Sequence, residues 1–124
     1  MKILLVDDER LRLEGGPGPL TIEADSPETQ YSPFHMLASG LAVCVYSVLA
    51  SWGVNAKLPV DDLAIEVGWK FAEDPHRVGE FDVQVIWPSL PENRRAAAER
   101  AAHLCAVHKT FEHSPHIHTT VRAA

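Results

Sequence analysis

The longest apolar segment of the chain runs from Phe34 to about Trp52, and it contains no charged residue. Its few polar positions follow one slowly drifting stripe at helical spacing, and they are His35, Ser39, Ser47 and Ser51. The pair Ser32-Pro33 stands directly before the segment. Such a pair is typical of a helix start, because serine caps free N–H groups and proline fits the first turn. The pattern therefore predicts one long helix.

A helix that is apolar nearly all round must be covered on nearly every side. One chain of 124 residues can hardly surround about five turns of helix. The pattern therefore predicts a homodimer in which two copies of this helix share an interface, and Gly40 and Ala42 would let the backbones approach closely. The most apolar stretch, Met36 to Ala50, is too short to span a bilayer, so no membrane contact is expected.

Two later segments alternate apolar and polar residues as strands do. The first carries Leu63, Ile65, Val67, Trp69 and Phe71, and the second carries Phe81, Val83, Val85 and Trp87. The short connection Asp74-Pro75-His76 predicts that the two strands pair as an antiparallel hairpin. Near the N-terminus, residues 2–6 are β-prone. A second hairpin or a meander is predicted to continue there through Leu11, Leu13, Leu20 and Ile22.

A second helix is predicted from Pro91-Glu92 to about Ala106, because the segment is rich in alanine and basic residues. Alternation at Ile117, Thr119 and Val121 predicts a final strand. The order of strands, buried helix, hairpin, helix and strand places the chain in the α+β class. It predicts a single domain over residues 1–124, with helices packed on an antiparallel sheet.

Composition narrows the set of partners and the compartment. The formal net charge is −6 and the basic residues are mostly scattered, so nucleic acid and anionic membranes are not expected as partners. Two cysteines do not make a disulfide framework, and the short first apolar run is not a signal peptide. The expected compartment is the cytoplasm, where both thiols start reduced. The sequence has no phosphate-binding loop or nucleotide fingerprint, so no cofactor is expected.

Cys44 and Cys105 are the residues that best fit a chemical role. Cys44 lies midway along the predicted buried helix, and Cys105 lies at or just past the end of the second helix. One interpretation is that both cysteines are buried and act as small hydrophobic side chains. The other is a redox pair, in which one thiol attacks an oxidant and the other resolves the sulfenic acid as a disulfide.

The run from Ser32 to Cys44 begins with Ser-Pro and continues through small and apolar residues. It resembles the signature helix of the OsmC/Ohr family, the osmotically inducible and organic-hydroperoxide-resistance proteins. The run from Ala101 to Thr110 resembles the second cysteine motif of that family, in which a cysteine ends a helix. The order of the predicted elements also matches, and the resemblance covers nearly the whole chain.

The resemblance implies an intertwined homodimer with two sites at the subunit interface. It implies that Cys44 attacks the peroxide and Cys105 resolves the intermediate, with organic hydroperoxides as substrates and lipoyl-type dithiols as reductants. In the family's peroxidases an arginine stabilises the thiolate and a glutamate holds that arginine. Here Phe34 and His35 stand where the glutamate is expected, so His35 is its candidate replacement. Arg10 and Arg12 are the candidates for the arginine.

A thiol without a cationic neighbour keeps a high pKa and reacts slowly. The alternative function is therefore a non-catalytic dimer of the same fold that binds a hydrophobic small molecule at the subunit interface. The groups that surround Cys44 in the folded protein decide between the two functions.

Histidines are frequent towards the C-terminus, where His103 and His108 flank Cys105. On a strand His116 and His118 would share one face, but no carboxylate or cysteine evidently completes a set of metal ligands with them. The expectation for this tail is a solvated polar edge without a metal site. His35, His103 and His108 are interpreted either as surface or interface histidines or as groups that act on the thiols.

Overall fold

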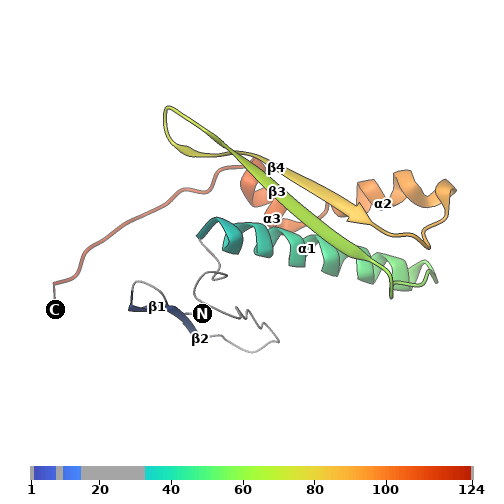
Figure 1. The fold of residues 1–124 in the computed structure, drawn as a ribbon, viewed down its shortest axis with the longest axis horizontal. Coiled ribbons are helices and arrows are strands. Elements are labelled where there is room, and N and C mark those ends of the chain that lie inside the picture. Colours follow the sequence, from blue (N-terminus) through green and yellow to red (C-terminus); the bar gives the residue numbers. More distant parts are fainter. Residues whose placement is uncertain (1, 8–9, 15–32, 124) are drawn as a thin grey trace. The chain divides into compact units, whose positions relative to one another are not determined.

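The computed structural model describes residues 2–7, 10–14 and 33–123, and Figure 1 shows their fold. At the N-terminus, β1 (Lys2–Asp7) and β2 (Arg10–Glu14) pair antiparallel, which confirms the hairpin predicted there. For these two strands the structure describes the backbone and not the side chains. The predicted continuation through Leu20 and Ile22 lies outside the described residues.

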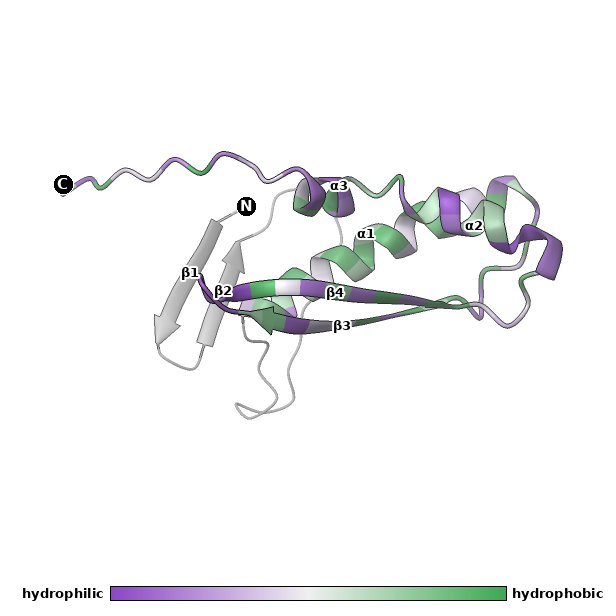
Figure 2. Ribbon diagram, turned by 90° about the horizontal axis from the view of Figure 1, so that it is seen from above, coloured by the Kyte–Doolittle hydropathy of each residue, from purple (hydrophilic) through white to green (hydrophobic). Residues whose placement is uncertain are grey.

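The long apolar helix forms as predicted, and α1 spans the 23 residues Pro33–Asn55. One stripe of α1 is buried, with members three or four residues apart: Ala38, Leu41, Val45, Leu49 and Gly53. Figure 2 shows α1 hydrophobic along most of its length. Several of its large apolar side chains are nevertheless exposed, namely Leu37, Val43, Tyr46 and Val54. The elements within residues 33–123 therefore do not bury this helix on nearly all sides.

By length and composition alone, α1 could cross a membrane. This corrects the expectation that the apolar segment is too short, because the helix extends beyond Met36 to Ala50 at both ends. Core helices of soluble proteins pass the same test. The buried stripe of α1 packs against other elements of the same chain, as a core helix does.

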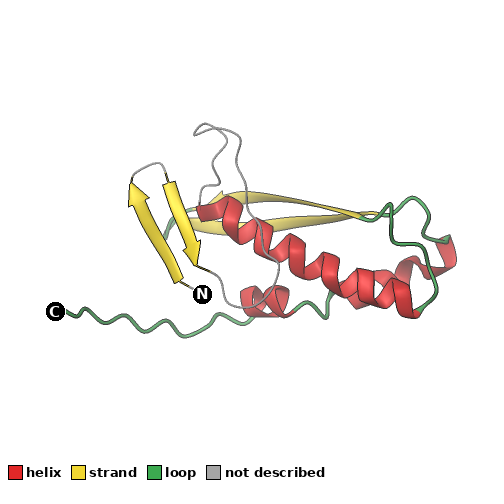
Figure 3. Cartoon of the chain, turned by 90° about the horizontal axis from the view of Figure 1, so that it is seen from below, coloured by secondary structure: helices red, strands yellow, loops and turns green. Residues whose placement is uncertain are grey.

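The two alternating segments form the predicted antiparallel hairpin of β3 (Ala64–Ala72) and β4 (Arg77–Ile86). The register places Ile65 opposite Val85 and Trp69 opposite Phe81. Side chains that point to one face of a hairpin repeat every second residue. Four such side chains pack against the core: Ile65, Val67, Phe81 and Val85. Figures 1 and 3 show α1 lying along this hairpin.

The second predicted helix is interrupted. The chain forms a short turn, η2 (Glu92–Arg94), then α2 (Arg95–Ala102), and after a linker of residues 103–105 it forms α3 (Ala106–Glu112). Cys105 explains the break, because its backbone is not helical, with φ −59° and ψ 124°. Its sulfur accepts a hydrogen bond from the His108 N–H, with 3.4 Å between N and Sγ. Cys105 therefore caps α3, and the prediction of one continuous helix to Ala106 is wrong.

The final strand expected at Ile117, Thr119 and Val121 does not form, since residues 114–123 contain no strand. The side chains of Ile117 and Val121 are 79% and 94% exposed. A strand is stabilised by backbone hydrogen bonds to a neighbouring strand. Within residues 33–123 the described ladder joins β3 to β4 and includes no third strand. Alternation without a partner is not enough to make a strand here.

The core lies between α1, α2 and the β3–β4 hairpin, which confirms the α+β class. Its buried members are Leu41, Val45, Leu49, Leu63, Trp87, Ala98, Ala101 and Cys105. Trp87 donates its indole N–H to the Pro59 carbonyl at 2.9 Å. Its ring meets that of Trp52 edge to face, with 6.0 Å between centroids. Cys105 therefore belongs to the same packed cluster as the residues that hold the helices to the hairpin.

Gly53 is a point of close approach between α1 and its surroundings. A Cβ added there would lie 2.7 Å from Cγ1 of Val60 and 2.8 Å from Cη2 of Trp87. Alanine favours a helix over glycine by about 1 kcal/mol, but overpacking of a core costs about 1–3 kcal/mol. Both contacts are shorter than 3.0 Å, so neighbouring atoms must shift and the overpacking cost should be about 2–3 kcal/mol. We therefore expect Gly53→Ala to lower the free energy of unfolding by about 1–2 kcal/mol in chemical denaturation.

The matched control is Ser51→Ala, at an exposed position of the same helix. This variant should change the free energy of unfolding by less than about 0.5 kcal/mol. A Gly53→Ala protein as stable as the wild type would show that Val60 and Trp87 do not pack tightly against α1.

Candidate functional site

Cys44 and Cys105 come together although they lie far apart in the sequence. Cys44 projects from the middle of α1 and is half-buried, whereas Cys105 is fully buried, with 0% of its surface exposed. The linker between α2 and α3 carries Cys105, and a hydrogen bond joins its side chain to that of Cys44. Both cysteines are free thiols. The two sulfur atoms are therefore neighbours that can act as a pair.

The surroundings shift the pKa values of the two thiols in opposite directions. Burial raises the pKa of Cys44, but hydrogen bonds from the Cys105 thiol and from the backbone N–H groups of Val107 and Ala106 bring this pKa below its ordinary value. Burial and the hydrogen bond to Cys44 raise the pKa of Cys105, against a smaller lowering by the His108 N–H. Hydrogen bonds to the charged form of an acid favour that form. Cys44 is therefore the thiol that ionises first.

The N–H groups of Ala106 and Val107 are functional groups that the sequence analysis missed. They belong to the first turn of α3, where backbone N–H groups have no acceptor inside their own helix. The usual capping residues are serine, threonine, aspartate and asparagine. Because cysteine is not among them, the sequence around Cys105 gives little sign that a new helix begins there.

His35 lies away from the thiol pair within one chain. Because α1 is continuous, the nine residues from His35 to Cys44 turn about 900°, which puts them on opposite faces. The His108 ring contacts the Glu112 carboxylate at 2.8 Å, and only the backbone N–H of His108 reaches Cys105. Among the described residues, no imidazole or guanidinium contributes to the pKa of Cys44.

Arg10 and Arg12 belong to β2, whose side chains are not described. The assignment of a thiolate-stabilising role to either arginine therefore stays a prediction. The same holds for a role of His35 across a subunit interface.

A groove of about 560 Å³ is lined by the end of β4 and by η2 and α2. Apolar residues in its lining include Val85, Trp87 and Leu90, and charged ones are Glu92, Arg95 and Glu99. Neither cysteine lines it. The groove and the thiol pair are therefore separate features of the described part of the chain.

Comparison with known proteins supports the resemblance found in the sequence. A family model described as OsmC-like protein matches residues 26–120, a range that contains both cysteines. A crystal structure from Psychrobacter arcticus 273-4, assigned as an osmotic stress induced and detoxification response protein, is similar at 25% sequence identity with a TM-score of 0.59. The similarity covers 64% of this chain and 58% of that one, so this chain spans less than two thirds of that protein's length. No curated protein matches.

Proposed function

This chain belongs to the OsmC-like family, which points to a stress-response or peroxidase-related role, and we propose that it is a thiol-dependent peroxidase acting on organic hydroperoxides. The observation that carries the proposal is the hydrogen-bonded contact between Cys44 and Cys105. It lowers the pKa of one thiol and raises that of the other. A nucleophile that ionises readily next to a thiol that stays protonated is the arrangement that a two-cysteine peroxidase needs.

In the first step the Cys44 thiolate attacks the outer oxygen of the hydroperoxide. The O–O bond breaks, the alkoxide takes up a proton to leave as an alcohol, and Cys44 becomes a sulfenic acid. In the second step the Cys105 sulfur attacks the Cys44 sulfur, a disulfide forms, and water leaves. A dithiol reductant then exchanges with this disulfide, is itself oxidised, and restores both thiols.

Uncharged donors support the thiolate of Cys44 in this mechanism. The hydrogen bonds from Cys105, Ala106 and Val107 supply stabilisation that the family resemblance assigns to an arginine. An arginine from the N-terminal hairpin, Arg10 or Arg12, would add a full charge to these hydrogen bonds. His35 would orient such an arginine if it takes the place of the family's glutamate.

We also propose that the active form is a cytoplasmic homodimer with its sites at the subunit interface. The support for the dimer is the exposed apolar surface on α1, which consists of Leu37, Val43, Tyr46 and Val54. Burying such surface against a second copy is favourable by about 25 cal/mol per Å². An apolar interface of this kind also suits the hydrocarbon part of an organic hydroperoxide.

The proposal is tested by counting free thiols before and after one equivalent of an organic hydroperoxide such as cumene hydroperoxide. We expect the reduced protein to lose two thiols per chain and its intact mass to fall by two hydrogen atoms, because oxidation joins Cys44 to Cys105 within one chain. A dithiol should restore both thiols. If both thiols stay free after prolonged exposure to excess hydroperoxide, the peroxidase proposal fails and binding of a hydrophobic small molecule becomes the better function.

A further inference from the structure

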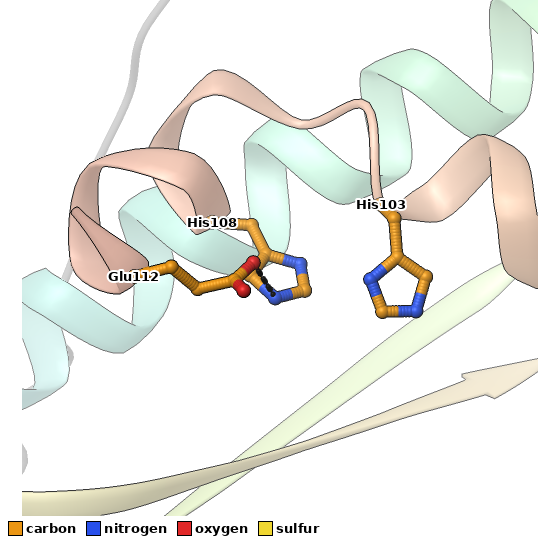
Figure 4. A group of neighbouring side chains, drawn as sticks. All are labelled: His103, His108 and Glu112. Atoms are coloured by element: carbon orange, nitrogen blue, oxygen red, sulfur yellow. Dashed lines mark ion pairs between the residues drawn. The ribbon is translucent and has the colours of Figure 1, made fainter.

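Three side chains that commonly ligate metals converge where α2 gives way to α3. They are His103, His108 and Glu112, and one ligand atom from each lies within 4.8 Å of the other two. Figure 4 shows His108 and Glu112 side by side on α3, with His103 on the preceding linker. The His108 Nε2 lies 2.8 Å from the Glu112 Oε1, and the ring centroids of His103 and His108 are 5.0 Å apart. No metal site was expected among the histidines from the sequence, and the Glu112 carboxylate gave no signal there.

We propose that His103, His108 and Glu112 form a binding site for a divalent transition-metal ion of the Zn²⁺ type. Two imidazoles and one carboxylate are a donor set that Zn²⁺ accepts in proteins, with a fourth position left for water. Imidazole also favours Zn²⁺, Cu²⁺ and Ni²⁺ over Mg²⁺ and Ca²⁺, which prefer oxygen ligands.

The geometry requires only a small adjustment. Ligand atoms held about 2.0–2.1 Å from a tetrahedral metal ion lie about 3.3 Å from one another. His108 and Glu112 are already closer than this, because a spacing of four residues puts them on one face of α3. His103 is exposed and must approach by at most about 1.5 Å, which rotation of its side chain can supply. The helix thus presents two ligands, and the linker delivers the third.

A metal ion at this site would affect how easily Cys105 becomes exposed. His103 precedes the buried cysteine by two residues, and His108 follows it by three. The His108 N–H also donates to the Cys105 sulfur, so ligand and thiol share one short segment. An ion bound to both histidines closes residues 103–108 into a ring around Cys105. An opening of the linker that separates His103 from His108 must then release the ion.

The test of binding is a titration of the reduced full-length protein with Zn²⁺ in competition with a chromogenic chelator. We expect one ion per chain, and we expect His103→Ala, His108→Gln and Glu112→Gln each to weaken binding at least about tenfold. Loss of groups that merely support metal ligands already costs about 10–100-fold, so loss of a ligand should cost no less.

Two control variants separate this site from other ligands in the chain. The triple variant His113→Ala, His116→Ala, His118→Ala removes the exposed tail histidines, and Cys44→Ser removes the more acidic thiol. Both should bind Zn²⁺ within about twofold of the wild type. Retention of wild-type affinity by the His108→Gln protein, or loss of binding in either control, would overturn the proposed site.

A second measurement detects the bound ion through the reactivity of Cys105. In the Cys44→Ser background, alkylation of the buried Cys105 requires opening of the linker. At a free Zn²⁺ concentration of about 100 times the dissociation constant, opening that expels the ion becomes about 100-fold rarer, so alkylation should slow by about that factor. Adding His108→Gln should remove the protection and leave the metal-free rate within about threefold. Equal protection with and without His108 would contradict the site.

Discussion

The Cys44→Ser protein is expected to consume organic hydroperoxide more than about 1000-fold more slowly than the wild type, since covalent catalysis fails without its nucleophile. Cys44 is the half-buried member of the pair and the one whose pKa is lowered. Cys105 cannot readily take its place, because its thiol is fully buried and this burial raises its pKa. Peroxide consumption followed over time, with dithiol present to allow turnover, measures this effect.

The Cys105→Ser protein is the complementary variant, because it removes the resolving thiol and keeps Cys44. Serine is a good N-cap, so the start of α3 should be kept. Cys44 should still react once, and without a resolving thiol the product should stop at sulfenic acid or proceed to sulfinic acid. Intact-mass measurement distinguishes these species by the number of oxygen atoms gained. A Cys44→Ser protein that reacts normally, or a Cys105→Ser protein whose Cys44 stays unmodified, would contradict the assigned roles.

The pH dependence of the first step tests the cause of the lowered pKa. The reaction rate should rise with pH while the Cys44 thiol ionises and then level off. Because the Cys105 thiol donates a hydrogen bond to Cys44, Cys105→Ala should move this rise to higher pH. A rise at the same pH in both proteins would show that other groups stabilise the Cys44 thiolate.

The elements with a regular apolar pattern were predicted correctly from the sequence, because that pattern depends on neighbouring residues alone. The Pro33–Asn55 helix and the β3–β4 hairpin each have a continuous pattern and a clear boundary residue or turn. The break at Cys105 has no such signal, because it depends on a buried sulfur that caps α3. The expected strand at Ile117 fails for the opposite reason, since its alternation is regular but the described chain offers it no partner.

The sequence predicted the two cysteines of the candidate site but not the groups that surround them. The sequence can single out Cys44 and Cys105 by type and by family resemblance. It cannot show that the N–H groups of Ala106 and Val107 point to Cys44, because any residue could supply them. The carboxylate of Glu112 was also missed. Its spacing of four residues from His108 predicts a pair of ligands on one face only if residues 108–112 form a helix, and no helix was predicted there.

Aspartate at two nearby positions of α1 should have very different effects on the protein. Val45 belongs to the buried stripe and is 1% exposed. An unpaired carboxylate in such a place costs several kcal/mol, which is a large part of the 5–15 kcal/mol that stabilises a typical domain. We therefore expect Val45→Asp to be unfolded or nearly so at room temperature, as measured by far-ultraviolet circular dichroism and denaturant titration.

Val43 lies on the opposite side of the same helix and is 51% exposed in the single chain. In an isolated chain Val43→Asp should therefore change stability by no more than about 0.5 kcal/mol. In the proposed dimer the same carboxylate enters an apolar interface, which costs several kcal/mol. The dissociation constant of the dimer should therefore rise at least about 100-fold. Light scattering over a range of concentrations should show a dimeric wild type and a folded, monomeric Val43→Asp protein. A wild type that is a stable monomer at micromolar concentration would rule out the dimer, and a Val43→Asp protein that stays dimeric would exclude this face of α1 as its interface.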